Sequence, residues 1–473
     1  MVSFLLGIAA NDNWASVSGA KTAGAAVAAT PTARLWRERL PWTCGPETVL
    51  EALAGESHLC CLSGVWAGGG AMVACEPLRV AGPDADPFAT LDDLPAVDTA
   101  GVDAWGAVGG GWLGWLGYRL AERVERVPVA GPRPAPLPDF HLAYYDHLLR
   151  RDAYGSWWFE ALITPPRQAA LKQRLEHLRT LVGDQLAGSA GPRPTPLRLS
   201  AAVAQRHLHA VAACRERIAA GEIFQANICL RLEGEYSGTA SALLRSALVH
   251  GRVPQYAASF DTPAGGIVSL SPELFLRRLG RRVRSGPIKG TAHRPDDPSR
   301  AVLSLEQLQS SAKDAAEHVM IVDLMRNDIG RVCEYGSVYA PRRPTAEAHP
   351  GLWHLVTTVE GRLRAQTANA ALVRACFPPG SVTGAPKVQA LKVIAELEPT
   401  GREVYTGAVG YASPLAGLEL NVAIRTLELA GGRAWLGVGG AIVADSNPEA
   451  ELEEALIKAR PVAAAVGTSV IAE

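Results

Sequence analysis

The sequence predicts an α/β protein in which short strands alternate with long amphipathic helices. In the second half, apolar residues recur at helical spacing in the segments 201–220 and 298–328, and strand-like runs lie between such segments. In the first half, short runs rich in tryptophan and tyrosine alternate with glycine-rich turns such as 65–70 and 105–112. Helical and strand periodicity in one chain exclude an all-α or an all-β fold.

Individual elements follow from the same patterns. The runs 142–145 and 156–163 predict strands, and 166–181 predicts a helix. The helix 201–220 should end at Gly221, since glycine is favoured just beyond a helix C-terminus. We expect a last helix from Ser446 to about 460, because the segment 446–449 has the spacing of a capping box and a proline in the first turn.

A glycine- and proline-rich stretch, 186–200, predicts a linker between an N-terminal region (34–185) and a C-terminal region (201–465). Residues 1–33 are rich in alanine and threonine and carry almost no charge, so we expect a disordered extension. They contain no basic segment before their short apolar run, which argues against a signal peptide.

Composition narrows the function classes. The chain has 473 residues, 48% of them hydrophobic, and a net charge of −1, so it can bury a large core but offers no basic field for nucleic acid. No apolar run reaches the ~20 residues of a membrane helix. The eight cysteines lack metal-type spacing and predict buried, reduced thiols in a cytoplasmic protein.

Lys289 is the first candidate for chemistry. It lies in the run Pro287-Ile288-Lys289-Gly290-Thr291, after the apolar strand-like stretch 266–276. A proline and a glycine on either side predict a constrained turn that projects a primary amine. Such an amine can act as a nucleophile, although an ordinary surface lysine fits the same pattern.

Two carboxylate pairs have helical spacing. Asp314 and Glu317 are three residues apart in one predicted helix, and Glu451 and Glu454 repeat that spacing in the last helix. If the two helices converge, their oxygens would suit Mg²⁺. Spacing alone favours two solvated helix faces over a metal site, and Glu449 is better explained as a residue that complements the helix dipole.

Glycine-rich segments provide a third kind of candidate. The segments 377–387 and 437–443 do not match a dinucleotide fingerprint or a P-loop, because their glycine and lysine spacing differs. Backbone amides in such segments can still bind a carboxylate. Arg425 could pair with a carboxylate in a bidentate manner. His354 lies in an apolar strand-like run, where a histidine is more often a core residue than a catalyst.

Read in order, these segments resemble the chorismate-utilising enzyme family. The resemblance is strong over 205–460 and weaker over 40–165. Its marks are the segments 222–227, 271–273, 287–291, 316–328, 354–361, 383–387, 405–411, 423–426 and 439–443. It implies two packed, antiparallel-rich β-sheets flanked by helices, with the N- and C-terminal regions intertwined as one body. The region 34–185 would correspond to the N-terminal part of anthranilate synthase component I.

The resemblance also implies a reaction. Pro-Ile-Lys-Gly-Thr around Lys289 is typical of the members that form aminodeoxychorismate, whereas anthranilate-forming members typically carry alanine there. Lys289 would attack C2 of chorismate and Glu273 would protonate the departing C4 hydroxyl. The product, 4-amino-4-deoxychorismate, would lead to p-aminobenzoate and folate. An anthranilate-forming activity and a non-catalytic chorismate-binding or scaffolding subunit are the alternatives.

Carried over residue by residue, the resemblance implies a complete site. Glu317 and Glu454 would be the principal Mg²⁺ ligands, and Asp314 and Glu451 would support them through water. His354 would face the ring of the substrate. The implied substrate-binding residues are Gln225, Thr291, Thr383, Gly384, Lys387, Tyr405, Arg425, Gly439 and Gly440. Water-adding relatives carry a lysine in the place of Gln225.

The resemblance implies one partner. The chain contains no segment with the features of a glutaminase, so a separate glutamine amidotransferase subunit would supply ammonia.

Overall fold

The computed structural model describes residues 33–128, 131–135, 137–183, 192–251, 253–295, 297–310, 312–349 and 352–472. The predicted disordered extension, 1–33, lies outside these residues except for Ala33, and so does the part of the predicted linker up to residue 191. The side chains of Asp314 and Thr291 are also outside the description.

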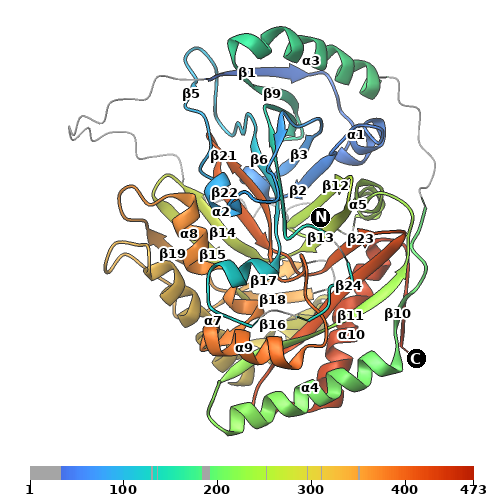
Figure 1. Cartoon of the computed structure of the whole chain (residues 1–473), viewed down its shortest axis with the longest axis vertical. Helices are drawn as coiled ribbons and strands as arrows, with labels where there is room; N and C mark the ends of the chain where they lie inside the picture. Colours follow the sequence, from blue (N-terminus) through green and yellow to red (C-terminus); the bar gives the residue numbers. More distant parts are fainter. Residues whose placement is uncertain are drawn as a thin grey trace.

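The helices lie mainly in the second half of the chain (Figure 1). They are α1 (Pro46–Ala52), α2 (Pro87–Thr90), α3 (Gln168–Gly183), α4 (Ala201–Ala219), α5 (Ala240–Val249), α6 (Pro298–Ser310), α7 (Ala312–Gly330), α8 (Asn369–Cys376), α9 (Lys387–Leu397) and α10 (Pro448–Ala465). The predicted helices 166–181 and 201–220 are confirmed as α3 and α4. Gly221 directly follows Ala220, the C-cap residue of α4.

A large sheet of fourteen described strands forms one layer. Its order is β25 (Val470–Ala472), β10 (Leu197–Leu199), β11 (Gln225–Glu235), β24 (Arg433–Ile442), β23 (Thr426–Ala430), β13 (Gly265–Ser271), β12 (Tyr256–Thr262), β2 (Cys60–Gly64), β3 (Gly70–Ala74), β8 (His147–Arg151), β9 (Trp157–Ile163), β1 (Ala33–Leu40) and β5 (Val97–Asp98), and β20 (Gly384–Ala385) pairs with β11. Only its pairs β1–β5 and β10–β25 are parallel among the described strands.

Two further sheets complete the described fold, and their strand pairs are antiparallel. The second runs β19 (Val359–Arg362), β15 (Arg282–Gly286), β14 (Leu274–Leu279), β22 (Gly417–Val422), β21 (Ala408–Ser413), β6 (Gly111–Leu116), β7 (Phe140–Tyr145) and β4 (Arg79–Val80). The third runs β16 (Ile288–His293), β18 (Leu352–Val356) and β17 (Thr345–His349). The predicted antiparallel-rich α/β architecture is confirmed.

Both large sheets contain strands from both halves of the chain. β2 pairs with β12, so Cys61 lies opposite Ser259, and β6 pairs with β21, so Gly114 lies opposite Gly410. Figure 1 shows these early and late strands side by side. The two halves therefore share hydrogen-bond ladders and form one body.

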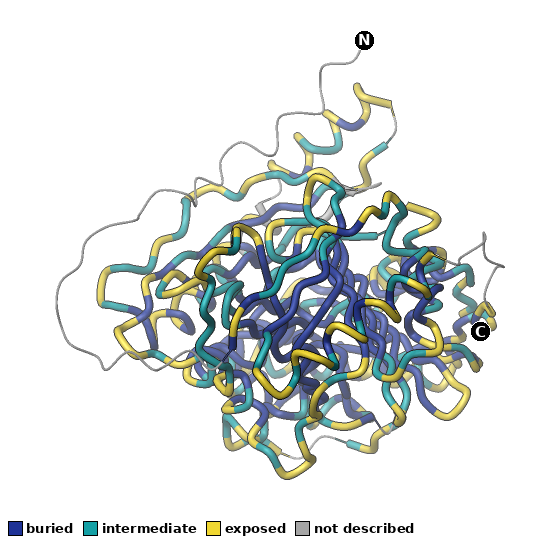
Figure 2. The backbone as a smooth tube through the Cα atoms, turned by 90° about the horizontal axis from the view of Figure 1, so that it is seen from above, coloured by how far each residue is buried: buried dark blue, intermediate teal, exposed yellow. Residues whose placement is uncertain are grey.

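The core lies between these layers. One apolar cluster joins β2, β6, β12 and β21 and includes Leu62, Trp115, Phe260 and Val409, each at most 1% exposed. A second joins the large sheet to the helices that cover it, through residues such as Leu243 in α5 and Ala459 in α10. Figure 2 shows the buried backbone gathered in the interior and the exposed segments around it.

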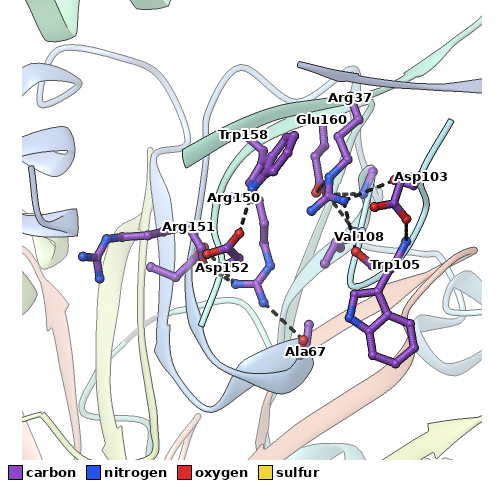
Figure 3. A network of polar contacts seen from close by, with 12 residues as sticks. Arg37, Ala67, Asp103, Trp105, Val108, Arg150, Arg151, Asp152, Trp158 and Glu160 are labelled. Atoms are coloured by element: carbon purple, nitrogen blue, oxygen red, sulfur yellow. Dashed lines mark hydrogen bonds and ion pairs between the residues drawn. The ribbon is translucent and has the colours of Figure 1, made fainter. Parts of the chain in front are cut away.

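Buried charged side chains form hydrogen bonds with backbone groups of the turns between strands in the N-terminal half (Figure 3). Arg150 on β8 is 2% exposed and donates hydrogen bonds to the carbonyls of Ala67 (3.1 Å), Gly69 (2.7 Å) and Ala71 (3.1 Å). On the neighbouring strand β9, Glu160 accepts a hydrogen bond of 2.7 Å from the amide of Val108. Ala67, Gly69 and Val108 lie outside the strands, so these side chains supply the hydrogen bonds that a buried turn requires.

Two predictions about helices were wrong in detail. The segment 298–328 forms α6 and α7 rather than one helix. The residue that caps α10 is Asn447, which accepts a hydrogen bond from the amide of Ala450, and Ser446 instead donates to Glu451 (2.6 Å). The proline in the first turn is confirmed.

Replacing Arg150 by methionine should lower the free energy of unfolding by about 3 kcal/mol, because buried carbonyls would lose their donor. Urea unfolding measures this change. Arg34→Met, at an exposed position on β1, is the control and should change it by less than about 0.5 kcal/mol. Equal effects of the two substitutions would contradict the role of Arg150.

Candidate active site

Lys289 lies in strand β16, so the predicted turn is wrong. The ladder between β16 and β18 is irregular, since its register shifts between Ile288 and Thr291, the stretch that contains Lys289. The proline and glycine beside Lys289 therefore accompany an irregular strand rather than a reversal of the chain. The amine projects from a sheet that helix α7 covers.

Glu273 lies in the short link between β13 and β14, which divides the strand-like stretch 266–276 into two strands. It is 4% exposed, and its carbonyl accepts a hydrogen bond of 3.0 Å from the amide of Val422. Burial raises the pKa of the Glu273 carboxyl to about 7. A hydrogen bond from Ser381 and the charges of Lys289 and Arg425 oppose this rise.

Lys289 is surrounded by charges of both signs. Burial lowers the pKa of its amine, and the positive charge of Lys458 lowers it further. The carboxylates of Glu317, Glu273 and Glu454 act in the opposite direction. An amine with a lowered pKa is a better nucleophile near neutral pH, because more of it is unprotonated.

One carboxylate of each predicted pair acts on Lys289. Glu317 on α7 and Glu454 on α10 both act on Lys289. Glu454 forms an ion pair of 2.7 Å with Lys458, whose amine also donates to the carbonyl of Gly439 (3.0 Å). Glu451 is buried beside Gly440 on the neighbouring strand β24.

Glu317 and Glu454 offer carboxylate oxygens, the kind of donor that Mg²⁺ prefers. The ion is usually held by one or two carboxylates together with water and substrate oxygens. Among the side chains that the structure describes, no group of three or more histidine, cysteine, aspartate or glutamate residues is placed to hold a metal. Asp314, the fourth predicted ligand, lies outside these side chains.

Residues 437–442 of the glycine-rich segment lie in β24, opposite β11. A Cβ atom on Gly440 would lie 2.9 Å from the carboxylate of Glu451, and one on Gly437 would overlap the ring of Tyr405. Glycines therefore allow α10 and Tyr405 to approach the strand closely. Gln225 at the start of β11 is fully buried, and neither polar atom of its amide has a hydrogen-bond partner in the described structure.

The ring of Tyr405 lies against this strand. The hydroxyl of Tyr405 lies 3.7 Å from the thiol of Cys229, and the side chain is buried. Arg425 adopts a left-handed backbone conformation with φ of 51°, between β22 and β23. Burial lowers the pKa of its guanidinium to about 10, and Glu273 opposes that shift. Arg425 and the acid therefore lie within electrostatic reach of each other.

His354 lies on β18, directly across the ladder from Thr291, and is 1% exposed. The two residues are thus in the same sheet as Lys289. The structure does not describe the side chain of Thr291.

The segment 377–387 uses several of its polar groups to hold itself in place. The hydroxyl of Thr383 donates to the carbonyls of Pro379 and Gly380. The amine of Lys387 binds Asp328 at 2.5 Å. Gly384 pairs with Ala226 through the short strand β20. The predicted substrate contacts of these three residues therefore compete with contacts inside the protein.

Sequence reasoning missed several residues at this site. Lys458 lies four residues after Glu454, a helical spacing that could have identified the pair. Ser381 lies inside a segment whose glycines were considered but whose hydroxyl was not. His318, beside Glu317, binds the hydroxyl of Thr357 at 2.5 Å, and no sequence pattern links them.

Comparison with known proteins identifies the family of this chain. Residues 68–464 match the family described as chorismate binding enzyme. The chain belongs to the chorismate-binding enzyme family. Aminodeoxychorismate synthase component 1 of Salmonella typhimurium is 36% identical to it over 354 residues, which cover 74% of this chain and 75% of the relative.

Other relatives of this chorismate-binding enzyme carry different names. Anthranilate synthase component 1 of Streptomyces coelicolor is 33% identical over 407 residues, covering 80% of this chain and 77% of the relative. The crystal structure of anthranilate synthase component I from Streptococcus pneumoniae superposes with a TM-score of 0.70 at 24% identity, covering 95% of each chain. That likeness confirms the fold.

None of the helices in the described part of this chorismate-binding enzyme is long and apolar enough to cross a membrane.

Lys289→Met should raise the pKa of Glu273 above 7, because it removes a positive charge that favours the carboxylate. Infrared difference spectra between each protein and its Glu273→Gln variant, recorded across pH, report the protonated carboxyl. Arg34→Met, far from the site in sequence and exposed on β1, should leave the midpoint unchanged. An unchanged midpoint in Lys289→Met would show that Lys289 carries no charge that acts on Glu273.

Proposed function

We propose that this chorismate-binding enzyme converts chorismate and ammonia into 4-amino-4-deoxychorismate and water. One observation carries the proposal: an amine with a lowered pKa, Lys289, lies beside a buried carboxyl, Glu273, whose pKa is raised to about 7. A nucleophile and a proton donor can then coexist near neutral pH. The relatives named aminodeoxychorismate synthase component 1 support this activity.

In the first step, the neutral amine of Lys289 forms a bond to C2 of chorismate. The ring double bonds shift and the C4–oxygen bond breaks. The hydroxyl leaves as water because the protonated carboxyl of Glu273 gives it a proton, and the resulting carboxylate can accept the proton that the lysine nitrogen loses. Burial of Glu273 keeps its proton available for a poor leaving group.

In the second step, ammonia forms a bond to C4, the double bonds shift back and the C2–nitrogen bond of the lysine breaks. One proton from the added nitrogen returns to the departing lysine through Glu273. The amine and the acid end in their starting states, and one hydroxyl has been replaced by one amino group. Two displacements thus replace one difficult substitution.

The surrounding residues would hold the substrate. Arg425 offers a buried guanidinium to a carboxylate, and the backbone amides near Gly439 and Gly440 offer further donors. The amide of Gln225 is buried without a hydrogen-bond partner in the described structure, so substrate oxygen could satisfy it. Tyr405 and His354 would contact the rest of the molecule.

We propose Mg²⁺ as the cofactor, held principally by Glu317 and Glu454. The bound ion would neutralise a carboxylate of chorismate and so anchor it. Glu451 and Asp314 would support the site through water. The chain's own Lys458 neutralises part of the carboxylate charge through its ion pair with Glu454.

Ammonia would come from a separate glutamine amidotransferase subunit. The relatives' name, component 1, supports a second component. The product would then feed p-aminobenzoate and folate synthesis.

Lys289→Ala should slow formation of aminodeoxychorismate by at least about 100-fold with chorismate, Mg²⁺ and ammonium, because it removes the nucleophile. Chromatography of the product measures this. Intact-protein mass spectrometry without ammonia should show wild-type protein heavier by one chorismate minus one water, and Lys289→Ala protein without that increase. Unchanged turnover in Lys289→Ala would refute the covalent step.

The same assay distinguishes the proposed activity from the nearest alternative, an anthranilate-forming activity. Anthranilate is the second candidate product because an anthranilate synthase component is 33% identical to this chain. Anthranilate fluorescence in the absence of an added lyase would replace the proposed activity. Binding of chorismate without any turnover would indicate a non-catalytic subunit.

Once Lys289 is unprotonated, the rate of adduct formation without ammonia should fall as pH rises above about 7, because Glu273 must be protonated to act as the acid. Glu273→Gln should remove that decline and lower the rate by about 10²–10⁴-fold. Single-turnover mass spectrometry across pH gives both results. If the rate still declined with rising pH in Glu273→Gln, a group other than Glu273 would be responsible for the decline.

A further inference from the structure

One loop, Phe377–Gly384, runs from the end of helix α8 to the first residue of strand β20 and reaches the proposed acid. Ser381 in this loop is 7% exposed and its hydroxyl forms a hydrogen bond with the carboxyl of Glu273. The other groups that act on this carboxyl are Lys289, Arg425 and the backbone amide of Ile288, which come from other segments. Ser381 is thus the contact through which the loop can orient the acid.

The first half of the loop is fixed by the amine of Lys387. That amine donates to the carboxylate of Asp328 (2.5 Å) and to the carbonyls of Cys376 (2.8 Å) and Pro378 (3.0 Å). An ammonium has three hydrogens, so all of its donors are used. The side chains of Lys387 and Asp328 are only 10% and 4% exposed, where water screens the pair poorly.

The second half is fixed by another cation. Arg402 is 3% exposed and donates to the carbonyl of Val382 (2.7 Å), the residue after Ser381, and to that of Asn227 on β11 (2.5 Å). Its charge is balanced by Glu398, at 2.7 Å. The loop is therefore attached on both sides of Ser381 by carbonyl bonds to buried, ion-paired cations.

The loop also packs against α7, the helix that carries both Glu317 and Asp328. A Cβ atom on Gly380 would lie 2.9 Å from the side chain of Leu324 on that helix. The loop thus has little room to shift towards or away from α7.

We propose that Lys387 and Asp328, together with Arg402, are positioning residues that hold the loop Phe377–Gly384 so that Ser381 keeps its hydrogen bond to Glu273. This inference rests on the proposed role of Glu273 as the acid. It gives Lys387 a role other than the substrate contact that the sequence predicts. The paired variant Lys387→Met/Asp328→Asn removes the ion pair without leaving an isolated buried charge.

The test compares this paired variant with Ser381→Ala and with the triple variant that combines them. Loss of the Ser381 hydrogen bond should raise the pKa of Glu273 by about 0.5–1 unit in each. The decline of adduct formation should move to higher pH by the same amount. The triple variant should shift no further than Ser381→Ala alone, because all three variants lose one contact.

A matched control removes another shielded ion pair. Arg174→Met/Glu56→Gln breaks a pair whose side chains are 9% and 12% exposed and should lower stability without moving either midpoint. Unshifted midpoints in Lys387→Met/Asp328→Asn, or shifts that add to that of Ser381→Ala, would overturn the proposal. Ser381→Ala leaves the ion pair intact, so an unshifted midpoint there overturns it even if the paired variant folds poorly.

Infrared titration of ligand-free protein separates this inference from the proposed function. If Glu273 is not the acid, its pKa still moves in these variants although the activity profile does not. If the loop is not held by Lys387, the infrared midpoint of the paired variant stays at the wild-type value while Glu273→Gln still abolishes the decline in activity.

Discussion

Charge held away from water is the constraint on which this structure depends. A buried charge is tolerated only where other charges or backbone dipoles compensate it. The charge of Arg150 is compensated by backbone carbonyls to which it donates hydrogen bonds. The charge of Arg402 is compensated by the carboxylate of Glu398 and by two backbone carbonyls. At the proposed catalytic centre the compensation is incomplete, since Glu273 has a raised pKa and Lys289 a lowered one. Buried charges that are fully compensated thus support the structure, whereas those that are incompletely compensated acquire shifted pKa values and become reactive.

The sheet register places the reactive groups against this background. β11 and β24 pair from Ala226 to Glu235, which puts Gly440 opposite Ile228 and lays α10 beside the strand. Glu454 on α10 and Glu317 on α7 therefore both act on Lys289, although more than a hundred residues separate them in sequence. Lys458 lies among them and makes an ion pair with Glu454. The centre is a meeting point of three sheets and two helices.

Sequence alone predicted what is local or repeated. The helices α3 and α4 and the proline in the first turn of α10 follow from spacing and cap chemistry. The irregular strand around Lys289 did not, because its conformation depends on pairing with β18. The cap of α10 was displaced by one residue, since Ser446 donates instead to Glu451 in the first turns of the same helix. Local rules fail where another partner competes.

The candidate site shows the same division. Single residues such as Glu273 and Glu317 could be proposed from the resemblance, since each belongs to a short motif. Contacts between motifs could not, and Ser381 against Glu273 or Lys387 against Asp328 became visible only in three dimensions. The sequence names the chemical groups, whereas the fold decides which of them act on one another.

Because strands of each half complete the sheets of the other, this protein has no module that could be exchanged as a unit. A chimera that joined its first half to the second half of a relative would have to match the ladders β2–β12 and β6–β21 along their whole length. Variation can accumulate freely at loops outside these ladders, but recombination within the chain is constrained. The interleaved sheets thus limit which evolutionary or engineering routes can give this enzyme a new partner or product.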